Sequence, residues 1–244
     1  MRAQKIDNLV ALRNLVLKLA PAGVGIGVAD PAFSPATVLP EEAVAIANAI
    51  PKRKREFAAG RRAARQALEM LDHPAQAIPK ASNRTPVFPT GLTGSITHDR
   101  HSALAIVAPE TKYRAVGIDV EPDAPLKPEL MRAICTPEEA NVLAALPQDE
   151  RLLLGRRLFS AKEAVFKAQF PLTQQIFGFD AVTIAFDSLR TSFTARFTRD
   201  IASVREGSLL SGQAGNAGGH IATLVTLGAV QGSQNANFPV CATG

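Results

Sequence analysis

The sequence predicts an α+β fold, in which helices and strands occupy separate stretches of the chain. Helix signals gather in the first 73 residues and again between residues 128 and 170. Strand-like segments gather between residues 91 and 122 and again after residue 180. Segregated runs of this kind favour an α+β architecture over a wound parallel sheet. The composition, 46% hydrophobic and 20% charged, is typical of a globular chain that can bury a core.

The first part of the chain is predicted to be mostly helical. We expect a helix over residues 7–19, a short buried strand in VGIGVAD and a short helix in LPEEAVAIANAI. A long helix follows from Pro51 to the stop at His73-Pro74. Residues 74–91 are rich in proline and lack periodicity, so we expect an ordered loop.

The second part begins with strands and ends with strands. We expect strands in GLTGSITH, SALAIVAP and AVGIDVEP, then helices in PELMRAIC and TPEEANVLAALP and over residues 149–170. Thr136 is the expected cap of the middle helix. The last strands are expected near residues 181–186, 191–198 and 221–228, with a Gly/Ser/Asn-rich loop over 206–219.

Charge and cysteine content limit the classes of function. The net charge of +5 and the sequence pI of about 9.5 indicate an anionic partner. A single Tyr, the lack of Trp and the lack of a nucleic-acid-binding motif argue against a nucleic-acid partner. Cys135 and Cys241 are too few for a disulfide framework and match no zinc spacing, which favours a reducing, cytoplasmic compartment. Arg13 and Lys18 interrupt the apolar N-terminal stretch, so we expect neither a signal peptide nor a membrane span.

The segment GIDVEP carries two acids that point to one face of a strand. Asp119 and Glu121 alternate with Ile118 and Val120, which face the other way. Two carboxylates on one face, close to a proline that ends pairing, could hold Mg²⁺ together with a substrate phosphate. A solvated strand face is the alternative. A third acid that converges on this pair would favour the metal site, and Glu163 is the candidate.

The helix after Pro51 carries a stripe of basic residues. Half of the residues between Lys52 and Arg65 are Lys or Arg, and several of them, including Arg53 and Arg61, fall on one arc of the helix. Because a guanidinium group binds phosphate with two parallel hydrogen bonds, the stripe could bind phosphate. A solvated helix face and a nucleic-acid contact are the alternatives.

The segment GSITHDRH offers a histidine after a run of small residues. Small residues at Gly94 and Ser95 allow a ligand to approach the backbone, and His98 could bind phosphate or transfer a proton near pH 7. Ser95 lacks the G-x-S-x-G surroundings of a hydrolase nucleophile. Upstream, Lys80 and Arg84 add positive charge to the proline-rich loop, where solvated charges are the alternative interpretation.

The helix LFSAKEAVFKAQFPLT places a lysine within its apolar face. Lys162 falls between Leu158 and Phe166, and Glu163 falls at the edge of that face. A buried charge is costly unless another group pairs with it. An ion pair between Glu163 and Lys167 would contribute only ~0.2–0.5 kcal/mol, which is a weak reason for the arrangement.

Taken in order, RKREFAAGRRAAR, RTPVFPTGLTGSITH, VGIDVEP and FSAKEAVFKAQFPLT resemble the motifs of the Sfp-type 4'-phosphopantetheinyl transferases, and most closely the bacterial subgroup like enterobactin-synthetase component D. The resemblance covers roughly residues 50–190 and rests mainly on the spacing of G-I-D-x-E and F-x-x-K-E-A. It implies a pseudo-dimer of two similar α+β halves, residues 1–115 and 116–244, with the active site in the cleft between them.

The same resemblance implies transfer of the phosphopantetheine arm of coenzyme A to a serine of an apo carrier protein, with 3',5'-ADP as the other product. Mg²⁺, with Mn²⁺ as the alternative ion, would be held by Asp119, Glu121 and Glu163. Glu163 would help to deprotonate the serine, directly or through water, while Lys162 and Lys167 would neutralise the diphosphate. The groups implied to surround the coenzyme A nucleotide are Arg53, Arg61, Lys80, Arg84, Ser95 and His98.

Further expectations concern partners and departures from the family pattern. An acidic carrier helix suits the basic pI, and a chain with two similar halves is expected to act as a monomer. Phe88 and Phe159 replace frequent tryptophans and keep their apolar character. Asp99 stands where the subgroup often has Cys, and a negative charge is unexpected beside a phosphate site. The alternatives in other functional classes are a basic nucleotide- or nucleic-acid-binding protein without transferase activity and a metal-dependent phosphohydrolase.

Overall fold

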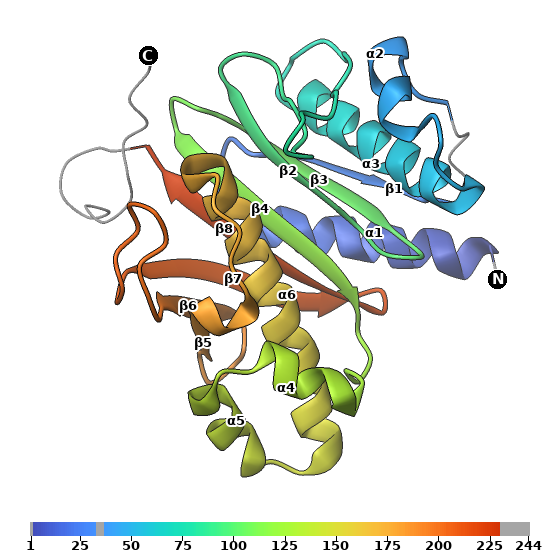
Figure 1. Cartoon of the computed structure of the whole chain (residues 1–244). Helices are drawn as coiled ribbons and strands as arrows, with labels where there is room; N and C mark the ends of the chain where they lie inside the picture. The colour runs from blue at the N-terminus through green and yellow to red at the C-terminus, as the bar shows by residue number, and fades with distance from the viewer. Residues whose placement is uncertain (1, 33–36, 230–244) are drawn as a thin grey trace.

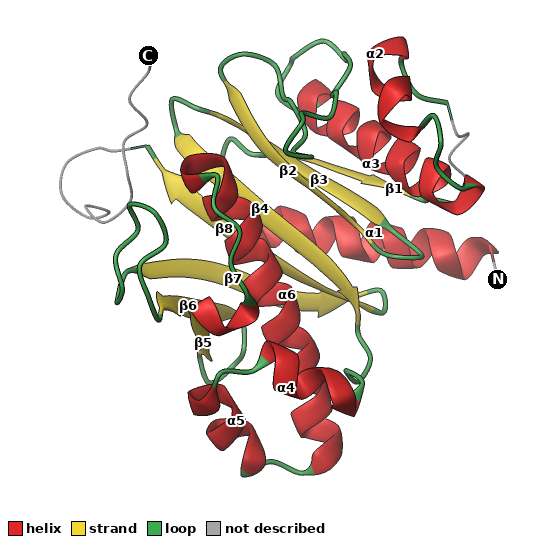
Figure 2. Cartoon of the chain, viewed as in Figure 1, coloured by secondary structure: helices red, strands yellow, loops and turns green. Residues whose placement is uncertain are grey.

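The computed structural model of the chain describes residues 2–32 and 37–229. Two antiparallel sheets each carry one long helix across a face, and a further helix runs behind both sheets (Figures 1 and 2). The helical elements are α1 (Arg2–Leu19), α2 (Pro40–Ala43), η1 (Val44–Ile46), α3 (Pro51–Glu69), η2 (Pro128–Leu130), α4 (Met131–Ile134), α5 (Pro137–Ala144), α6 (Gln148–Thr173) and η3 (Phe179–Ala181).

The strands fall into an N-terminal and a C-terminal sheet. They are β1 (Gly25–Ala29), β2 (Leu92–His98), β3 (Ala103–Pro109), β4 (Tyr113–Pro122), β5 (Val182–Phe186), β6 (Ser192–Phe197), β7 (Leu209–Ala217) and β8 (His220–Gly228). The first sheet has the order β1-β3-β2 and the second the order β4-β8-β7-β6-β5, with antiparallel pairing throughout. These elements confirm the α+β prediction.

Both halves bring a long helix onto a sheet through the same kind of close contact. A Cβ on Gly27 of β1 would lie 1.8 Å from the carbonyl oxygen of Ala63 in α3. A Cβ on Gly117 of β4 would lie 2.0 Å from the carbonyl oxygen of Ala164 in α6. Glycine is therefore required at both positions, since any side chain would push the helix away from the strand. The repeated sheet, helix and glycine contact agree with a pseudo-dimer of two α+β halves.

The two halves share a core and meet along β2 and β4. Leu12 and Val16 of α1 pack in one buried cluster with Ile106 of the first sheet and Ile118 and Leu224 of the second. At the junction of the sheets, the Ile118 N–H donates to Ser95 Oγ at 3.2 Å. This junction places residues 95–98 of β2 beside residues 118–121 of β4. The domain limits 1–115 and 116–244 remain a proposal.

The structure differs from the sequence prediction at three element boundaries. The first helix begins at Arg2 rather than residue 7, and α6 continues through Pro171 to Thr173. A proline in the last turn removes only one bond of the helical ladder. The predicted loop over 206–219 is wrong, because residues 209–217 form β7, paired on both sides with β6 and β8. The small residues of β7 are typical of a loop, so the sequence did not predict a strand. Gly212 is nevertheless needed in β7, because a Cβ there would lie 2.1 Å from the Phe193 ring.

Two further predictions concern cysteines and membranes. Cys135 is a free cysteine, and Cys241 lies outside the described residues. Within residues 2–32 and 37–229, none of the helices combines the length and the apolar character that a bilayer crossing demands.

Candidate active site

A pocket of about 270 Å³ opens where β2, β4 and α6 meet. All three predicted metal-binding carboxylates line it, together with one of the motif lysines and the motif histidine. The lining residues are Ile96, Thr97, His98, Asp119, Glu121, Phe159, Glu163 and Lys167. The junction of β2 with β4 and the glycine contact of α6 with β4 therefore bring three separate motifs together.

The two carboxylate oxygens of Asp119 differ in their contacts: one is hydrogen-bonded and the other has no hydrogen-bond partner. Its Oδ1 accepts hydrogen bonds from Thr97 Oγ1 at 3.0 Å and from Lys167 Nζ at 2.6 Å. Its Oδ2 is buried and has no hydrogen-bond partner. A buried, unpartnered carboxylate oxygen is costly, so this atom is suited to a cation that enters the pocket.

Glu121 is bound by an arginine from the N-terminal part of α6. Arg156 Nη1 donates to Glu121 Oε2 at 2.8 Å, and its remaining nitrogens donate to the carbonyl oxygens of Ala124 and Pro125. Burial and the charge of Asp119 nevertheless raise the pKa of Glu121 to about 7. Burial has the larger part in this shift, and Arg156 opposes it through its charge and its hydrogen bond.

Glu163 follows the same electrostatic pattern. Burial raises the pKa of this half-buried carboxyl group above its ordinary value, although the charge of Lys167 opposes the shift. A carboxylate with a raised pKa is a better proton acceptor than an exposed one near neutral pH. Glu163 comes to the pocket from α6, whereas Asp119 comes from β4.

The donor set fits a hard divalent cation. Among the described residues, no three His, Cys, Asp or Glu side chains are already arranged to hold a metal ion. The carboxylates of Asp119 and Glu121 are turned instead toward Lys167 and Arg156. Asp119 Oδ2 has no hydrogen-bond partner, and all three side chains offer carboxylate oxygens, which are the ligands that Mg²⁺ and Mn²⁺ prefer. Arg156 binds Glu121 through the single oxygen Oε2.

Basic groups from α3 reach the same pocket through His98. Arg53 Nη1 donates to His98 Nε2 at 2.5 Å, which requires that nitrogen to be unprotonated. Burial, followed by the charge of Arg53, lowers the pKa of His98. Glu56 lies 3.6 Å from Arg53 and 3.9 Å from His98, so a carboxylate already sits beside this pair.

The other predicted phosphate-binding arginine is mostly buried. Arg61 is 6% exposed, its Nε donates to the Ile78 carbonyl oxygen at 2.6 Å, and its guanidinium lies 4.0 Å above the Phe57 ring. Burial lowers the pKa of Arg61 to about 10. Lys80 is exposed and lines neither this pocket nor its larger neighbour.

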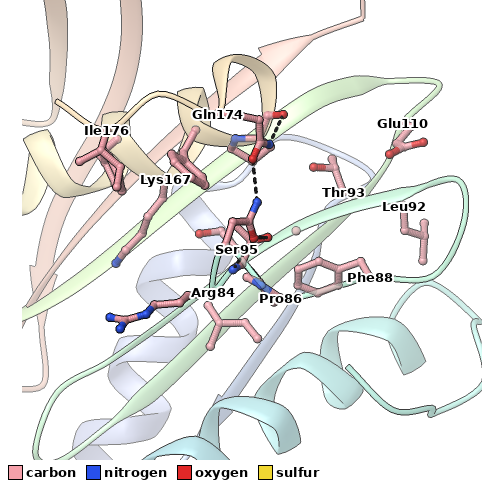
Figure 3. A pocket seen from close by; sticks show the side chains of 17 residues that line it. Arg84, Pro86, Phe88, Leu92, Thr93, Ser95, Glu110, Lys167, Gln174 and Ile176 are labelled. Atoms are coloured by element: carbon pink, nitrogen blue, oxygen red, sulfur yellow. Dashed lines mark hydrogen bonds between the residues drawn. The ribbon is translucent and has the colours of Figure 1, made fainter. Parts of the chain in front are cut away.

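A larger pocket of about 540 Å³ adjoins the acidic one, and Ile96 and Lys167 line both. Figure 3 shows Arg84 and Lys167 pointing to the same side of it, with Phe88 on another wall. The Asn83 side chain donates to Gln174 Oε1 at 2.6 Å and so links the proline-rich loop to the end of α6. Ser95 lines this pocket, but its hydroxyl already accepts the Ile118 N–H.

Lys162 does not join the site, contrary to the sequence prediction that it neutralises a diphosphate. Its side chain is 2% exposed, and its ammonium group donates to Glu139 Oε2 and to the carbonyl oxygens of Ile134 and Phe179. The buried charge is tolerated because Glu139 pairs with it, and not because a phosphate lies above it.

Sequence reasoning missed three residues that contact the predicted ligands. Thr97 binds Asp119, Arg156 binds Glu121, and Glu56 lies beside Arg53 and His98. The strand period could have found Thr97, since it shares a face with Ser95, and the i,i+3 spacing could have found Glu56. Nothing local marks Arg156, because its partner lies 35 residues earlier in the chain.

Comparison with known proteins shows the family to which this chain belongs. The family model of the 4'-phosphopantetheinyl transferase N-terminal domain matches residues 41–108, from α2 to β3. The model of the 4'-phosphopantetheinyl transferase superfamily matches residues 115–224, from β4 into β8. The chain belongs to the 4'-phosphopantetheinyl transferase superfamily, and it is a transferase of this type.

Individual relatives were found by comparison of sequences and of structures. The chain is 41% identical over 177 residues to the 4'-phosphopantetheinyl transferase PptT of Mycobacterium tuberculosis, an alignment that covers 72% of this chain and 76% of the relative. It is 38% identical to enterobactin synthase component D of Salmonella typhi over 54% of this chain and 55% of the relative. Among solved structures, the holo-[acyl-carrier-protein] synthase of Thermotoga maritima aligns with 49% of this chain and 66% of that chain, at 19% identity and a TM-score of 0.39.

Proposed function

We propose that this chain transfers the 4'-phosphopantetheine arm of coenzyme A to a serine hydroxyl of an apo carrier protein and releases 3',5'-ADP. The observation that carries the proposal is the convergence of Asp119, Glu121 and Glu163 in one pocket with Lys167 and His98. Carboxylates that can hold a divalent cation, beside basic groups that can bind phosphate, are the parts that phosphoryl transfer requires.

The three carboxylates are the proposed ligands of Mg²⁺, with Mn²⁺ as a possible substitute. When bound, the ion would neutralise the coenzyme A diphosphate and the charge that develops on its leaving oxygen. Asp119 would bind the ion through Oδ2, which has no hydrogen-bond partner. Glu121 would bind it with the carboxylate that now accepts a hydrogen bond from Arg156.

The chemical step is a substitution at the phosphorus that bears pantetheine. The serine Oγ forms a bond to this phosphorus, and the bond from this phosphorus to the bridging oxygen breaks. The bridging oxygen leaves on 3',5'-ADP. Glu163 accepts the serine proton, a role that its raised pKa favours. Lys167 lies at the junction of the two pockets, where its charge can stabilise the leaving phosphate.

Coenzyme A would extend from the acidic pocket into its neighbour. We place the 3'-phosphate near Arg53 and His98, with Arg61 as buried positive charge behind them. Arg84 and Ser95 would lie near the nucleotide, and Lys80 would contribute from outside the pocket. An arginine fork suits a phosphate, which accepts several hydrogen bonds, and a neutral His98 could donate one more from Nδ1.

The acceptor is proposed to be an acidic carrier protein, because the chain has a net charge of +5. Its relatives include a siderophore enzyme by name, so carriers of nonribosomal-peptide, polyketide or siderophore assembly are the first to test. We further propose that the protein acts as a monomer in the cytoplasm, where coenzyme A and apo carriers occur together.

Mass spectrometry of apo carrier domains tests the function directly. Incubation with the protein, coenzyme A and Mg²⁺ is expected to add the phosphopantetheine mass to at least one carrier. Chelation of the metal should abolish the addition. Release of inorganic phosphate without modification of any carrier would contradict the proposal and favour a phosphohydrolase.

The variant Glu163→Gln tests whether Glu163 takes part in the reaction without a role in the stability of the fold. We expect this variant to lose transfer at least about 100-fold, since a general base contributes on that scale, while its thermal unfolding is unchanged. Glu41→Gln, an exposed acid on α2, is the matched control and should transfer at the wild-type rate. Equal rates for Glu163→Gln and wild type would remove Glu163 from the proposed mechanism.

A further inference from the structure

Lys162 makes all of its polar contacts inside the C-terminal half. An ammonium group has three N–H donors. They are directed to the Ile134 carbonyl oxygen at 2.8 Å, to Glu139 Oε2 at 2.7 Å and to the Phe179 carbonyl oxygen at 2.9 Å. No donor is left for a substrate phosphate, and the side chain is only 2% exposed.

Glu139 is the centre of this buried network. Besides Lys162, its Oε2 accepts the Thr136 N–H at 2.7 Å, and its Oε1 accepts the Ile184 N–H at 2.7 Å. The Glu139 side chain is itself 2% exposed. One carboxylate therefore joins the first turn of α5, strand β5 and helix α6.

The network acts at the point of α6 that carries the proposed base. Lys162 directly precedes Glu163, and consecutive residues of a helix project about 100° apart. With Lys162 fixed to α4, α5 and η3 on one side, Glu163 must face the pocket on another. The ring of Phe159, which lines the pocket, packs 5.5 Å from the ring of Phe179, whose carbonyl oxygen binds Lys162.

Recruitment of Lys162 by a substrate would be unfavourable. The ammonium group would have to leave Glu139 as a buried carboxylate without its counter-ion, which is strongly destabilising. Lys167, in contrast, lines both pockets and is 24% exposed. Two lysines of one motif thus lie in different surroundings.

We infer that Lys162 is a positioning residue, and that its buried ion pair with Glu139 sets the rotation of α6 and so directs Glu163 into the pocket. Lys162 makes no contact with coenzyme A. This inference rests on the proposed transferase function, and it adds Glu139 as a residue on which the reaction depends.

Glu139→Gln is the first test, because the replacement keeps the shape of the side chain. Loss of the counter-ion should lower kcat by up to about 100-fold, since a displacement near 1 Å can have that effect, while the KM for coenzyme A changes little. If Lys162 were a phosphate ligand, release from Glu139 would leave kcat unchanged or raise it, and that result would overturn the inference.

The double variant Lys162→Met with Glu139→Gln is the second test. Lys162→Met alone leaves a buried unpaired carboxylate and should lower both the melting temperature and kcat. Neutralising both partners removes that penalty, so the double variant should regain melting temperature relative to Lys162→Met, while its KM for coenzyme A stays at the wild-type value. A KM for coenzyme A raised about tenfold or more in the double variant would overturn the inference, because a raised KM indicates a lost contact with coenzyme A.

Two controls distinguish a failure of the inference from a failure of the proposed function. Lys18→Met, at an exposed position of α1, should leave melting temperature, kcat and KM unchanged. If wild-type protein modifies no carrier, the proposed function fails and the inference fails with it. If wild type transfers normally and Glu139→Gln does too, only the inference fails.

Discussion

His220 and Asp99 form a buried ion pair that joins the two halves beside the active site. His220 Nε2 lies 3.4 Å from Asp99 Oδ2, an ion-pair distance rather than a short hydrogen bond, and both side chains are 7% exposed. His220 Nδ1 lies 2.9 Å from the Gly218 carbonyl oxygen, to which it must donate. Both ring nitrogens therefore need a proton, and the imidazole is charged when the pair is formed.

This pair answers the question that Asp99 raised in the sequence. Its Oδ1 accepts the N–H groups of His101 and Ser102, which closes the turn between β2 and β3. Burial alone would raise the pKa of Asp99, but the interaction with His220 and the hydrogen bonds from the His101 and Ser102 N–H groups outweigh it and lower the pKa. The acid is turned toward His220 rather than toward a phosphate, so it need not oppose coenzyme A binding.

Stability should depend on pH through His220. Burial would lower its pKa, but Asp99 outweighs burial and raises it. A raised pKa means that the stabilisation is complete below about pH 6.5, the ordinary value, and is lost as the pH rises through the higher folded value. The Asp99 contribution is lost only in acid, as the pH falls through its lowered pKa.

Urea unfolding of His220→Gln measures this effect. At pH 5.5 the variant should lose roughly 1.5–3 kcal/mol relative to wild type, the range for a hydrogen bond to a charged group, and less at pH 9. His101→Gln, an exposed neighbour, should lose little at either pH. A His220→Gln penalty that is the same at pH 5.5 and pH 9 would contradict the charged pair.

Local patterns predicted the elements better than they predicted the contacts between them. Helix α3 and strands β2 to β4 follow from periodicity, and the Thr136 cap is confirmed by its bond from the Glu139 N–H. Strand β7 was missed because its stability depends on two neighbouring strands and on the fit of Gly212 against Phe193, neither of which is a local signal.

The site was predicted by motif, and the roles of its residues were less predictable. The motifs predicted that Asp119, Glu121 and Glu163 converge, and all three line one pocket, while their role as metal ligands stays a prediction. The predicted contact of Lys162 with the diphosphate was wrong, because a charge on an apolar face can be neutralised by a substrate or by a distant residue of the chain, and the sequence does not distinguish the two. Its partner Glu139 looked like an ordinary acid in the first turn of a helix, where acids are favoured in any case.

Gly117→Ala should displace α6 from β4. The added Cβ would lie 2.0 Å from the Ala164 carbonyl oxygen, which is backbone and cannot turn aside. We expect a loss of roughly 3 kcal/mol in the free energy of unfolding, the upper end for overpacking, together with a loss of transfer as Glu163 and Lys167 shift. Gly228→Ala, where a Cβ meets nothing within 4 Å, is the control. Equal stability of the two variants would show that α6 does not need this contact.

Thr97→Val should weaken metal binding, although Thr97 is not itself a proposed metal ligand. The hydroxyl of Thr97 donates to Asp119 Oδ1 and accepts from Lys167 Nζ at 3.1 Å, so its loss removes one of the two hydrogen bonds that orient Asp119. Calorimetric titration with Mn²⁺ should show affinity reduced about 10–100-fold, the usual range for groups that orient a metal ligand. Thr97→Ser keeps the hydroxyl and should restore the affinity. Wild-type affinity in Thr97→Val would exclude this orienting role.

Metal binding should strengthen as the pH rises toward and past neutrality. Burial, followed by the charge of Asp119, raises the pKa of Glu121 to about 7. In the metal-free protein a raised carboxyl pKa destabilises the fold as the pH rises from about 4.3, the ordinary value, to 7, because the unfolded chain ionises first. Mg²⁺ binds only the ionised form, so calorimetry should show affinity increasing between pH 6 and pH 8 and levelling off above.

Two variants identify Glu121 as the titrating group. Glu121→Gln should bind Mg²⁺ more weakly and with a flatter dependence on pH over the same range. Arg156→Gln should move the rise to higher pH, because Arg156 lowers the pKa of Glu121 by its charge and by its hydrogen bond. A wild-type affinity that does not change between pH 6 and pH 8 would mean that Glu121 is not a ligand of the ion. A rise that stays at the same pH in Arg156→Gln would mean that another group controls it.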